Sequence, residues 1–274
     1  MRFASFPVAG PVGMIAALFA FSLLPAGAVV IVDTDFTNDL AGLTFDVTDG
    51  TNIAGYGTGG PGGSRGINLV DTTSASGGTN STVARFSTST VFSTSNANQS
   101  ELQIRFDMAV TSLGTTSGAN AVPRVLLRNS AAPSQTLTIG FGLTGGNSIL
   151  YAARGDNANP STALSYNFGA YNSTTLTEND TNGYVTIAIS LLHGGTTMNV
   201  TATQGSTTLF SGDVTGFTGN NFNQTNFNLN SATGQGGTGS LYVDNLFIQA
   251  VPEPTAALLL LSCIGLGSLR RRRA

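Results

Sequence analysis

The chain of 274 residues has no lysine, no tryptophan, one cysteine (Cys263) and one histidine (His193). With one thiol it can form no internal disulfide and no thiolate zinc site, and one histidine cannot build a multi-histidine metal centre. A serine–histidine–aspartate site would have to use His193, which precedes Gly194 and Gly195 where a strand is expected to end. No Gly-x-Ser-x-Gly motif accompanies it, so we expect no such site.

Charge is also scarce, at 9% of residues, and all eleven basic residues are arginines. Between residues 29 and 251, six arginines face thirteen acidic residues, which gives this region a formal net charge of −7. Nucleic-acid binding needs a cationic surface, so we expect no nucleic-acid partner. An acidic body suits a protein that stays soluble outside the cell or binds cations.

Apolar residues make up 41% of the chain, enough for a packed core despite 35 glycines. Residues 101–110, ELQIRFDMAV, alternate apolar and polar side chains with the period of a half-buried strand. Short runs of this kind, broken by Gly, Asn and Asp, predict an all-β fold: one antiparallel β-sandwich (jelly roll) over residues 29–250. We expect strands at 29–36, 41–47, 66–70, 101–110, 123–129, 135–143, 148–155, 184–192, 196–203, 207–210, 225–230 and 240–249. The rest of 50–81 is expected to be loop.

The N-terminus has the pattern of a secretory signal peptide. Arg2 precedes an apolar run from Met14 to Leu24, and Ala26 and Ala28 flank Gly27 in a small-x-small cleavage site. We expect a signal helix over residues 1–28, use of the secretion translocon, and cleavage after Ala28. The alternative is an N-terminal membrane anchor, for which the run is short.

The C-terminus combines three features in order. A Pro-Glu-Pro tripeptide (Pro252, Glu253, Pro254) precedes an uncharged apolar run over residues 255–269, and four arginines follow: Arg270, Arg271, Arg272 and Arg273. The run is short for a transmembrane helix but can cross with help from its flanks, and the arginines would hold that end in the cytoplasm. The prolines keep the tripeptide extended and accessible.

This tripartite pattern over residues 251–274 resembles the PEP-CTERM sorting signal of Gram-negative-type bacteria. The resemblance implies recognition and removal by an exosortase, a membrane-embedded cysteine transpeptidase-like enzyme. It implies an inner-membrane-anchored precursor whose product reaches the cell surface or extracellular matrix, often where exopolysaccharide is made. An ordinary tail anchor is the alternative, although it does not need the Pro-Glu-Pro.

The order of the expected strands resembles the concanavalin/laminin-G-like jelly rolls. The stretches that carry this likeness are DTDF at residues 33–36, GYVTIAISLL at 183–192 and LYVDNLFI at 241–248. An immunoglobulin-like sandwich is the main competitor. The length of the chain and its long loops favour the larger jelly roll.

Jelly rolls of this class can host paired carboxylates for glycoside hydrolysis. The three glutamates, Glu101, Glu178 and Glu253, lie far apart in sequence. Glu101 and Asp107 share a strand face, but six residues separate them by roughly 20 Å in an extended strand. We therefore expect no enzyme, while aspartate pairs formed by folding stay open.

A structural calcium ion is a further possibility, because hard cations bind several carboxylate and carbonyl oxygens. Asp33, Asp35 and Asp39 crowd the first strand and its loop, and Asp244 and Asn245 lie in the last strand. If first and last strands meet, as in some carbohydrate-binding jelly rolls, Asp33, Asp35 and Asp244 would share the ion. The alternative is that the first two face solvent and Asp244-Asn245 marks a β-bulge.

Carbohydrate binding would need aromatic platforms with polar surroundings. Tyr56, Tyr151, Tyr166 and Tyr171 lie in or near expected loops and could stack on sugar rings, or simply occupy the rim of the sandwich. We predict an exported surface or matrix protein with a structural or adhesive role. The alternatives are a carbohydrate-binding module, with extracellular polysaccharide as partner, and, less favoured, a glycoside hydrolase.

Overall fold

The computed structural model describes residues 29–47, 53–58, 60–71, 81–93, 101–112, 122–128, 132–155, 164–170, 183–192, 196–217, 221–230 and 239–251. The described residues form fifteen strands and two short 3₁₀ turns, η1 (Pro61–Gly63) and η2 (Pro133–Gln135). Within this part of the chain no helix is long and apolar enough to cross a membrane. The predicted signal helix, the C-terminal span and the sorting motif lie outside it.

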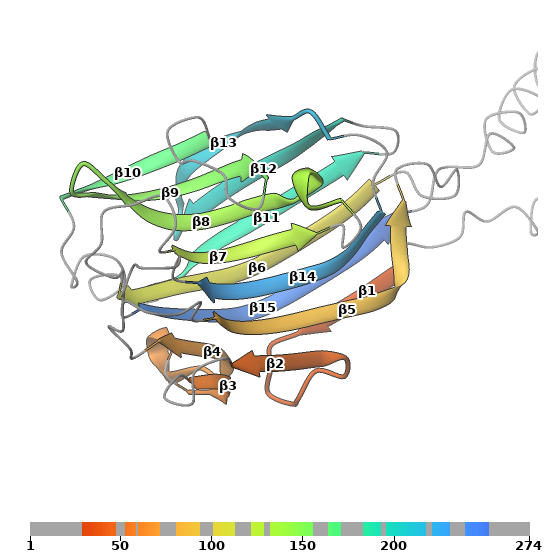
Figure 1. The fold of residues 1–274 in the computed structure, drawn as a ribbon, viewed down its shortest axis with the longest axis horizontal. Coiled ribbons are helices and arrows are strands. Elements are labelled where there is room, and N and C mark those ends of the chain that lie inside the picture. Colours follow the sequence, from red (N-terminus) through yellow and green to blue (C-terminus); the bar gives the residue numbers. More distant parts are fainter. Residues whose placement is uncertain are drawn as a thin grey trace, which may run out of the picture.

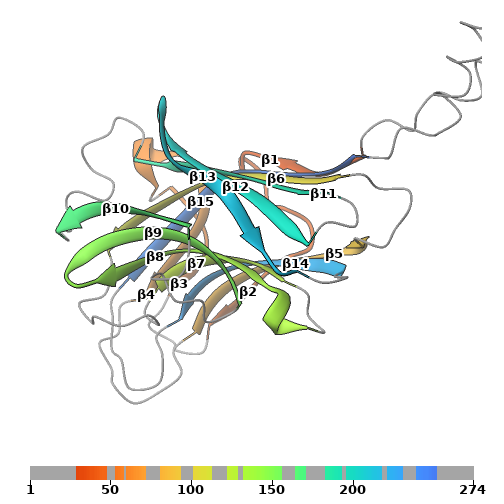
Figure 2. The same ribbon diagram turned by 90° about the horizontal axis from the view of Figure 1, so that it is seen from above.

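The strands form two antiparallel sheets, which Figures 1 and 2 show as two layers. Sheet A has the order β13 (Thr207–Thr215), β12 (Thr197–Gln204), β11 (Val185–Leu192), β6 (Glu101–Ser112), β15 (Gly239–Val251), β4 (Gly66–Asp71) and β3 (Ile53–Gly57), with β1 (Val29–Thr34) also pairing with β15. Sheet B has the order β10 (Leu164–Ala170), β9 (Asn147–Arg154), β8 (Leu137–Thr144), β7 (Val122–Arg128), β14 (Asn221–Asn230), β5 (Ser81–Ser93) and β2 (Leu43–Val47). The predicted antiparallel sandwich is thus confirmed.

The core lies between the sheets and follows from the alternation of apolar residues. In β6, Leu102, Ile104 and Phe106 point into it, while the intervening polar residues face outward. Phe106 meets Phe227 of sheet B edge to face, with ring centroids 6.3 Å apart. Each sheet therefore presents one face to the core and one away from it, and the outward faces are where polar sites can form.

Three strands were missed by the sequence analysis. The stretch 50–81 was expected to be loop apart from residues 66–70, yet Ile53–Gly57 forms β3. The strands β5 (Ser81–Ser93) and β10 (Leu164–Ala170) were not predicted either. All three are rich in Gly, Ser, Thr or Asn, so sheet pairing rather than local preference makes them strands.

The first and last strands pair, as predicted. Residues 29–34 of β1 run antiparallel to residues 246–250 of β15, whereas β4 pairs with residues 239–243 of the same strand. The partner changes at Asp244 and Asn245, where the register with β6 also shifts and Asn245 adopts a φ of 52°. A β-bulge therefore sits where the ends of β1 and β4 meet, and it shapes the adjoining surface.

Candidate functional site

A groove of about 1010 Å³ crosses the outward face of sheet A. One cross-strand row forms its centre: Asp33 of β1 pairs with Phe247 of β15, Phe247 with Arg105 of β6, Arg105 with Ala188 of β11, and Ala188 with Thr201 of β12. Five strands at about 4.8 Å spacing make this row roughly 19 Å long. The small side chain of Ala188 leaves the middle of the row open.

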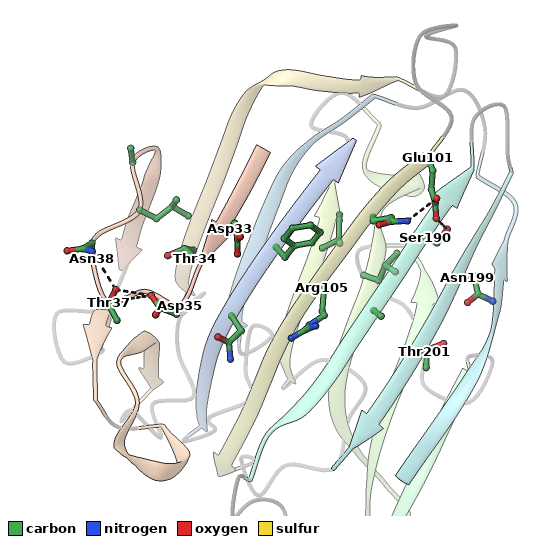
Figure 3. Close-up of a pocket in the computed structure, with 18 of the residues that line it drawn as sticks. Asp33, Thr34, Asp35, Thr37, Asn38, Glu101, Arg105, Ser190, Asn199 and Thr201 are labelled. Atoms are coloured by element: carbon green, nitrogen blue, oxygen red, sulfur yellow. Dashed lines mark hydrogen bonds between the residues drawn. The ribbon is translucent and has the colours of Figure 1, made fainter. Parts of the chain in front are cut away.

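The loop between β1 and β2 forms one wall of the groove. Figure 3 shows Asp35, Thr37 and Asn38 on this side, with Arg105 between them and the side chain of Thr201. Asp35 Oδ1 accepts hydrogen bonds from the backbone N–H of Thr37 at 3.0 Å and from its hydroxyl at 2.8 Å. Local side-chain bonds of this type fix a turn without help from a sheet.

The loop that forms this wall is held in position by the core and by Arg65. Phe36 has a φ of 57°, uncommon for a residue with a side chain, and its ring is fully buried in the core. Arg65, just before β4, donates to the Phe36 carbonyl and pairs with Asp39. The guanidinium also lies 4.6 Å from the ring centroid of Tyr56. These contacts hold the wall in place before any ligand arrives.

Hydroxyl, amide and carboxylate groups line the opposite half of the groove. Glu101 accepts a 2.5 Å hydrogen bond from the Ser190 hydroxyl and a 3.0 Å bond from the Gln103 amide (Figure 3). Asn199 donates to Asp213 on the neighbouring strand at 2.9 Å. Because these groups are oriented by one another, the groove offers fixed donors and acceptors to a ligand.

Negative charge dominates the groove. Its lining contains Asp33, Asp35, Asp39 and Glu101 against the guanidinium of Arg105. The hydrogen bonds from Thr37 hold the pKa of Asp35 below its ordinary value, so this carboxylate is ionised at neutral pH. The groove should therefore repel polyanions.

An aspartate pair formed by folding, a possibility that the sequence left open, lies beside the groove. Asp107 of β6 stands directly opposite Asp244 of β15, and Asn245 joins them, donating its backbone N–H to Asp244 at 2.8 Å and its side-chain amide to Asp107 at 2.7 Å. Asp244 is only 5% exposed, and burial raises its pKa, with Ser64 and Asn245 acting in the opposite direction through hydrogen bonds. Because it is covered, Asp244 stabilises the bulge rather than presenting an acid to a substrate.

The residues predicted to bind calcium are only partly brought together. Asp35 lies close enough to Asp244 for its charge to raise the pKa of that carboxyl, whereas Asp33 pairs with Phe247 in the groove. Within the described residues, no three His, Cys, Asp or Glu side chains converge as a metal site requires. The β-bulge at Asp244-Asn245, which was the alternative to a calcium site, is present and gives these residues another role.

The tyrosines predicted to bind glycan are dispersed. The ring of Tyr56 packs against Phe45 and Arg65, and its hydroxyl accepts a 2.7 Å hydrogen bond from the Leu40 N–H. Tyr166 packs against the core beside Phe168. Tyr151 is 1% exposed and lies on the face of sheet B that points away from the core. Tyr171 and His193 lie outside the described residues. None of the three described tyrosines lines the groove, where the aromatic residue is Phe247.

Comparison with known proteins places the fold. No protein-family model matches the chain, and no curated protein matches it in sequence. Among solved structures, the acidic lectin of winged bean, complexed with methyl-α-D-galactose, is 8% identical with a TM-score of 0.52 and covers 82% of this chain and 99% of its own. The legume lectin-like domain of Entamoeba histolytica is 8% identical with a TM-score of 0.46, over 82% of this chain and 98% of its own. The Emp47p carbohydrate recognition domain is 10% identical with a TM-score of 0.47, over 83% and 97%.

The likeness to the winged bean lectin shows that the chain has a lectin-type jelly-roll fold. At this identity it shows the fold alone. The larger jelly roll is therefore confirmed over the immunoglobulin-like sandwich. The comparison thus agrees with the predicted jelly-roll architecture, and it tests neither the resemblance to the concanavalin/laminin-G-like family nor the sorting signal.

Proposed function

We propose that this chain is an exported, non-enzymatic carbohydrate-binding protein that holds a neutral polysaccharide in the groove of sheet A. The observation that carries the proposal is the row Asp33, Phe247, Arg105, Ala188 and Thr201, which places one aromatic ring among oriented polar groups in an open groove. Sugar rings have apolar faces that stack on aromatic side chains and hydroxyls that need donors and acceptors around them.

The electrostatics of the groove select the sugar class. Carboxylates are strong acceptors for hydroxyl donors, and Asp35 and Glu101 are fixed in position by hydrogen bonds to neighbouring groups. A uronate or sulfated chain would meet like charge along the same surface. A neutral hexose polymer is thus the ligand that the groove fits. The acidic lectin of winged bean, which shares this fold, was solved in complex with methyl-α-D-galactose, a neutral sugar, and this agrees with the proposed class of ligand.

Export and sorting complete the proposal. The signal peptide over residues 1–28 and the PEP-CTERM signal over residues 251–274 would deliver the domain to the cell surface or extracellular matrix. Binding to matrix polysaccharide would then give the adhesive role predicted from the sequence a molecular basis. The partners are an exosortase-type enzyme during maturation and polysaccharide afterwards.

The test is retention of the full-length protein, solubilised in mild detergent, by native gels containing dextran, a β-1,3-glucan, a galactan or polygalacturonate. We expect retardation by at least one neutral polymer without release of reducing sugar. Retention by none of the neutral polymers would refute the proposal and favour a purely structural matrix role. Release of sugar that is lost in D107N would instead indicate a hydrolase.

A further inference from the structure

Exposed apolar side chains gather at one end of sheet A. Val30 of β1 is 50% exposed and Leu192 of β11 is 60% exposed. Val30 pairs with Gln249 of β15. Leu192 and Val251, the last residue of β15, both pair with Glu101 of β6. At about 4.8 Å per strand, Val30 and Leu192 lie roughly 14 Å apart, on either side of Val251. We call the surface formed by Val30, Leu192 and Val251 the terminal patch.

Both chain segments that we expect in the membrane join the domain at the terminal patch. The apolar run over residues 255–269 begins four positions after Val251, and four residues reach at most about 14 Å. Val29 pairs with Ala250, so the chain that follows the signal peptide enters the sheet beside the point where the chain leaves it. A membrane that holds either segment therefore lies within reach of this end of sheet A.

The charged groups near the terminal patch suit a lipid surface. The carboxylate of Glu101 accepts hydrogen bonds from Ser190 and Gln103, which lie further from the end of the sheet. Arg154, at the end of β9, is exposed and donates to the carbonyl of Gly216, just after β13. Strands β11 and β13 end on the same side of sheet A, so Arg154 lies at this end too. An arginine in this position can bind lipid phosphate.

An equally exposed apolar residue lies at the opposite end of sheet A. Ile53 of β3 is 52% exposed and pairs with Val70 of β4, which pairs with Ser240 of β15. Ser240 is 11 positions before Val251 on β15, roughly 36 Å along the strand. Ile53 therefore provides a matched control, because it resembles Val30 in character and exposure but lies far from the point where the chain leaves the domain.

We propose that the terminal patch is a membrane-contact surface, which rests on the lipid bilayer while the C-terminal span holds the chain. Val30 and Leu192 enter the boundary between headgroups and acyl chains, and Arg154 binds lipid phosphate. The inference depends on the export and sorting proposed above, because the span over residues 255–269 keeps the patch at the membrane. The body has a formal net charge of −7, so the tether and the apolar contact, rather than overall charge, hold it there.

This contact fixes the orientation of the groove on sheet A. The central row of the groove passes through Phe247, which is four residues before Val251 on β15 and thus about 13 Å from it. The row crosses the strands, whereas β15 points at the membrane, so the row runs parallel to the bilayer. A polysaccharide chain can therefore lie along the groove without entering the lipid.

The test uses introduced tryptophans, because the chain has none of its own. The full-length variants V30W, L192W and I53W are reconstituted into vesicles of equal parts phosphatidylcholine and phosphatidylglycerol. All three replaced side chains are exposed, and the melting temperature without lipid verifies folding. Apolar groups of interfacial proteins lie about 5–10 Å deep, so V30W and L192W should emit at shorter wavelength and lose at least about half their fluorescence to lipids brominated near the headgroup. I53W should show neither change.

Flotation with the vesicles after an alkaline carbonate wash tests the C-terminal span separately. Protein that floats while all three variants respond alike to brominated lipid would overturn the contact surface and leave the span intact. A shift to shorter wavelength without quenching would also overturn it, since a second copy of the chain would then cover the patch. Protein that does not float would refute both the span and the contact surface, whereas carbohydrate binding is measured without vesicles and stands or falls by itself.

Discussion

Removal of the Phe247 ring is the sharpest probe of the groove on sheet A. Phe247 lies on the outward face of β15, while its neighbours Leu246 and Ile248 are buried in the core. Full burial of a phenylalanine is worth about 1.5–3 kcal/mol, and this ring is already half-buried in the free protein. A stacked sugar can therefore gain about 1–2 kcal/mol from it, so F247A should weaken binding of a neutral polysaccharide by roughly 5- to 30-fold.

The measurement is isothermal titration calorimetry or gel retardation with the polymer that binds the wild type. Because the ring lies outside the core, F247A should cost less than about 1 kcal/mol of stability, a change of up to about 4 °C in the melting temperature. Tyr242 provides the matched control, as an aromatic residue on the same strand and the same face that does not line the groove. Unchanged affinity in F247A, or an equal loss in Y242A, would refute the placement of the ligand on this row.

The remaining predictions concern stability and maturation. Burial raises the pKa of Asp244, so the folded state holds a proton more readily than the unfolded chain. Stability should therefore rise as the pH falls through the folded pKa toward the ordinary value of 3.8, and D244N should flatten this dependence in unfolding measurements made across that window. F227A, which removes a fully buried ring, should cost about 3–5 kcal/mol and lower the melting temperature in calorimetry, and an unchanged value would contradict the packing of the two sheets. Intact-mass analysis of the surface-associated protein should show a start near Val29 and the loss of residues 255–274, and an intact C-terminus there would contradict processing.

Much of the fold was predictable because local alternation survives in most strands. The run 101–110 predicts its own inward face, and the structure places Leu102, Ile104 and Phe106 in the core as expected. Strands such as Ile53–Gly57 carry no such pattern, since Gly55 and Gly57 leave Ile53 as the one side chain on their face. Their assignment depends on the strand beside them, which the sequence alone does not specify.

The sites were less predictable, because each depends on which strands become neighbours. Phe247 and Arg105 are 142 positions apart in sequence and become directly opposed only through the pairing of β15 with β6. The sequence favours tyrosines near loops as glycan-binding residues, yet the aromatic residue of the groove is Phe247, within the last strand. A signal was present in the sequence: Leu246 and Ile248 are expected to face the core, so the alternation places the ring of Phe247 between them on the outward face.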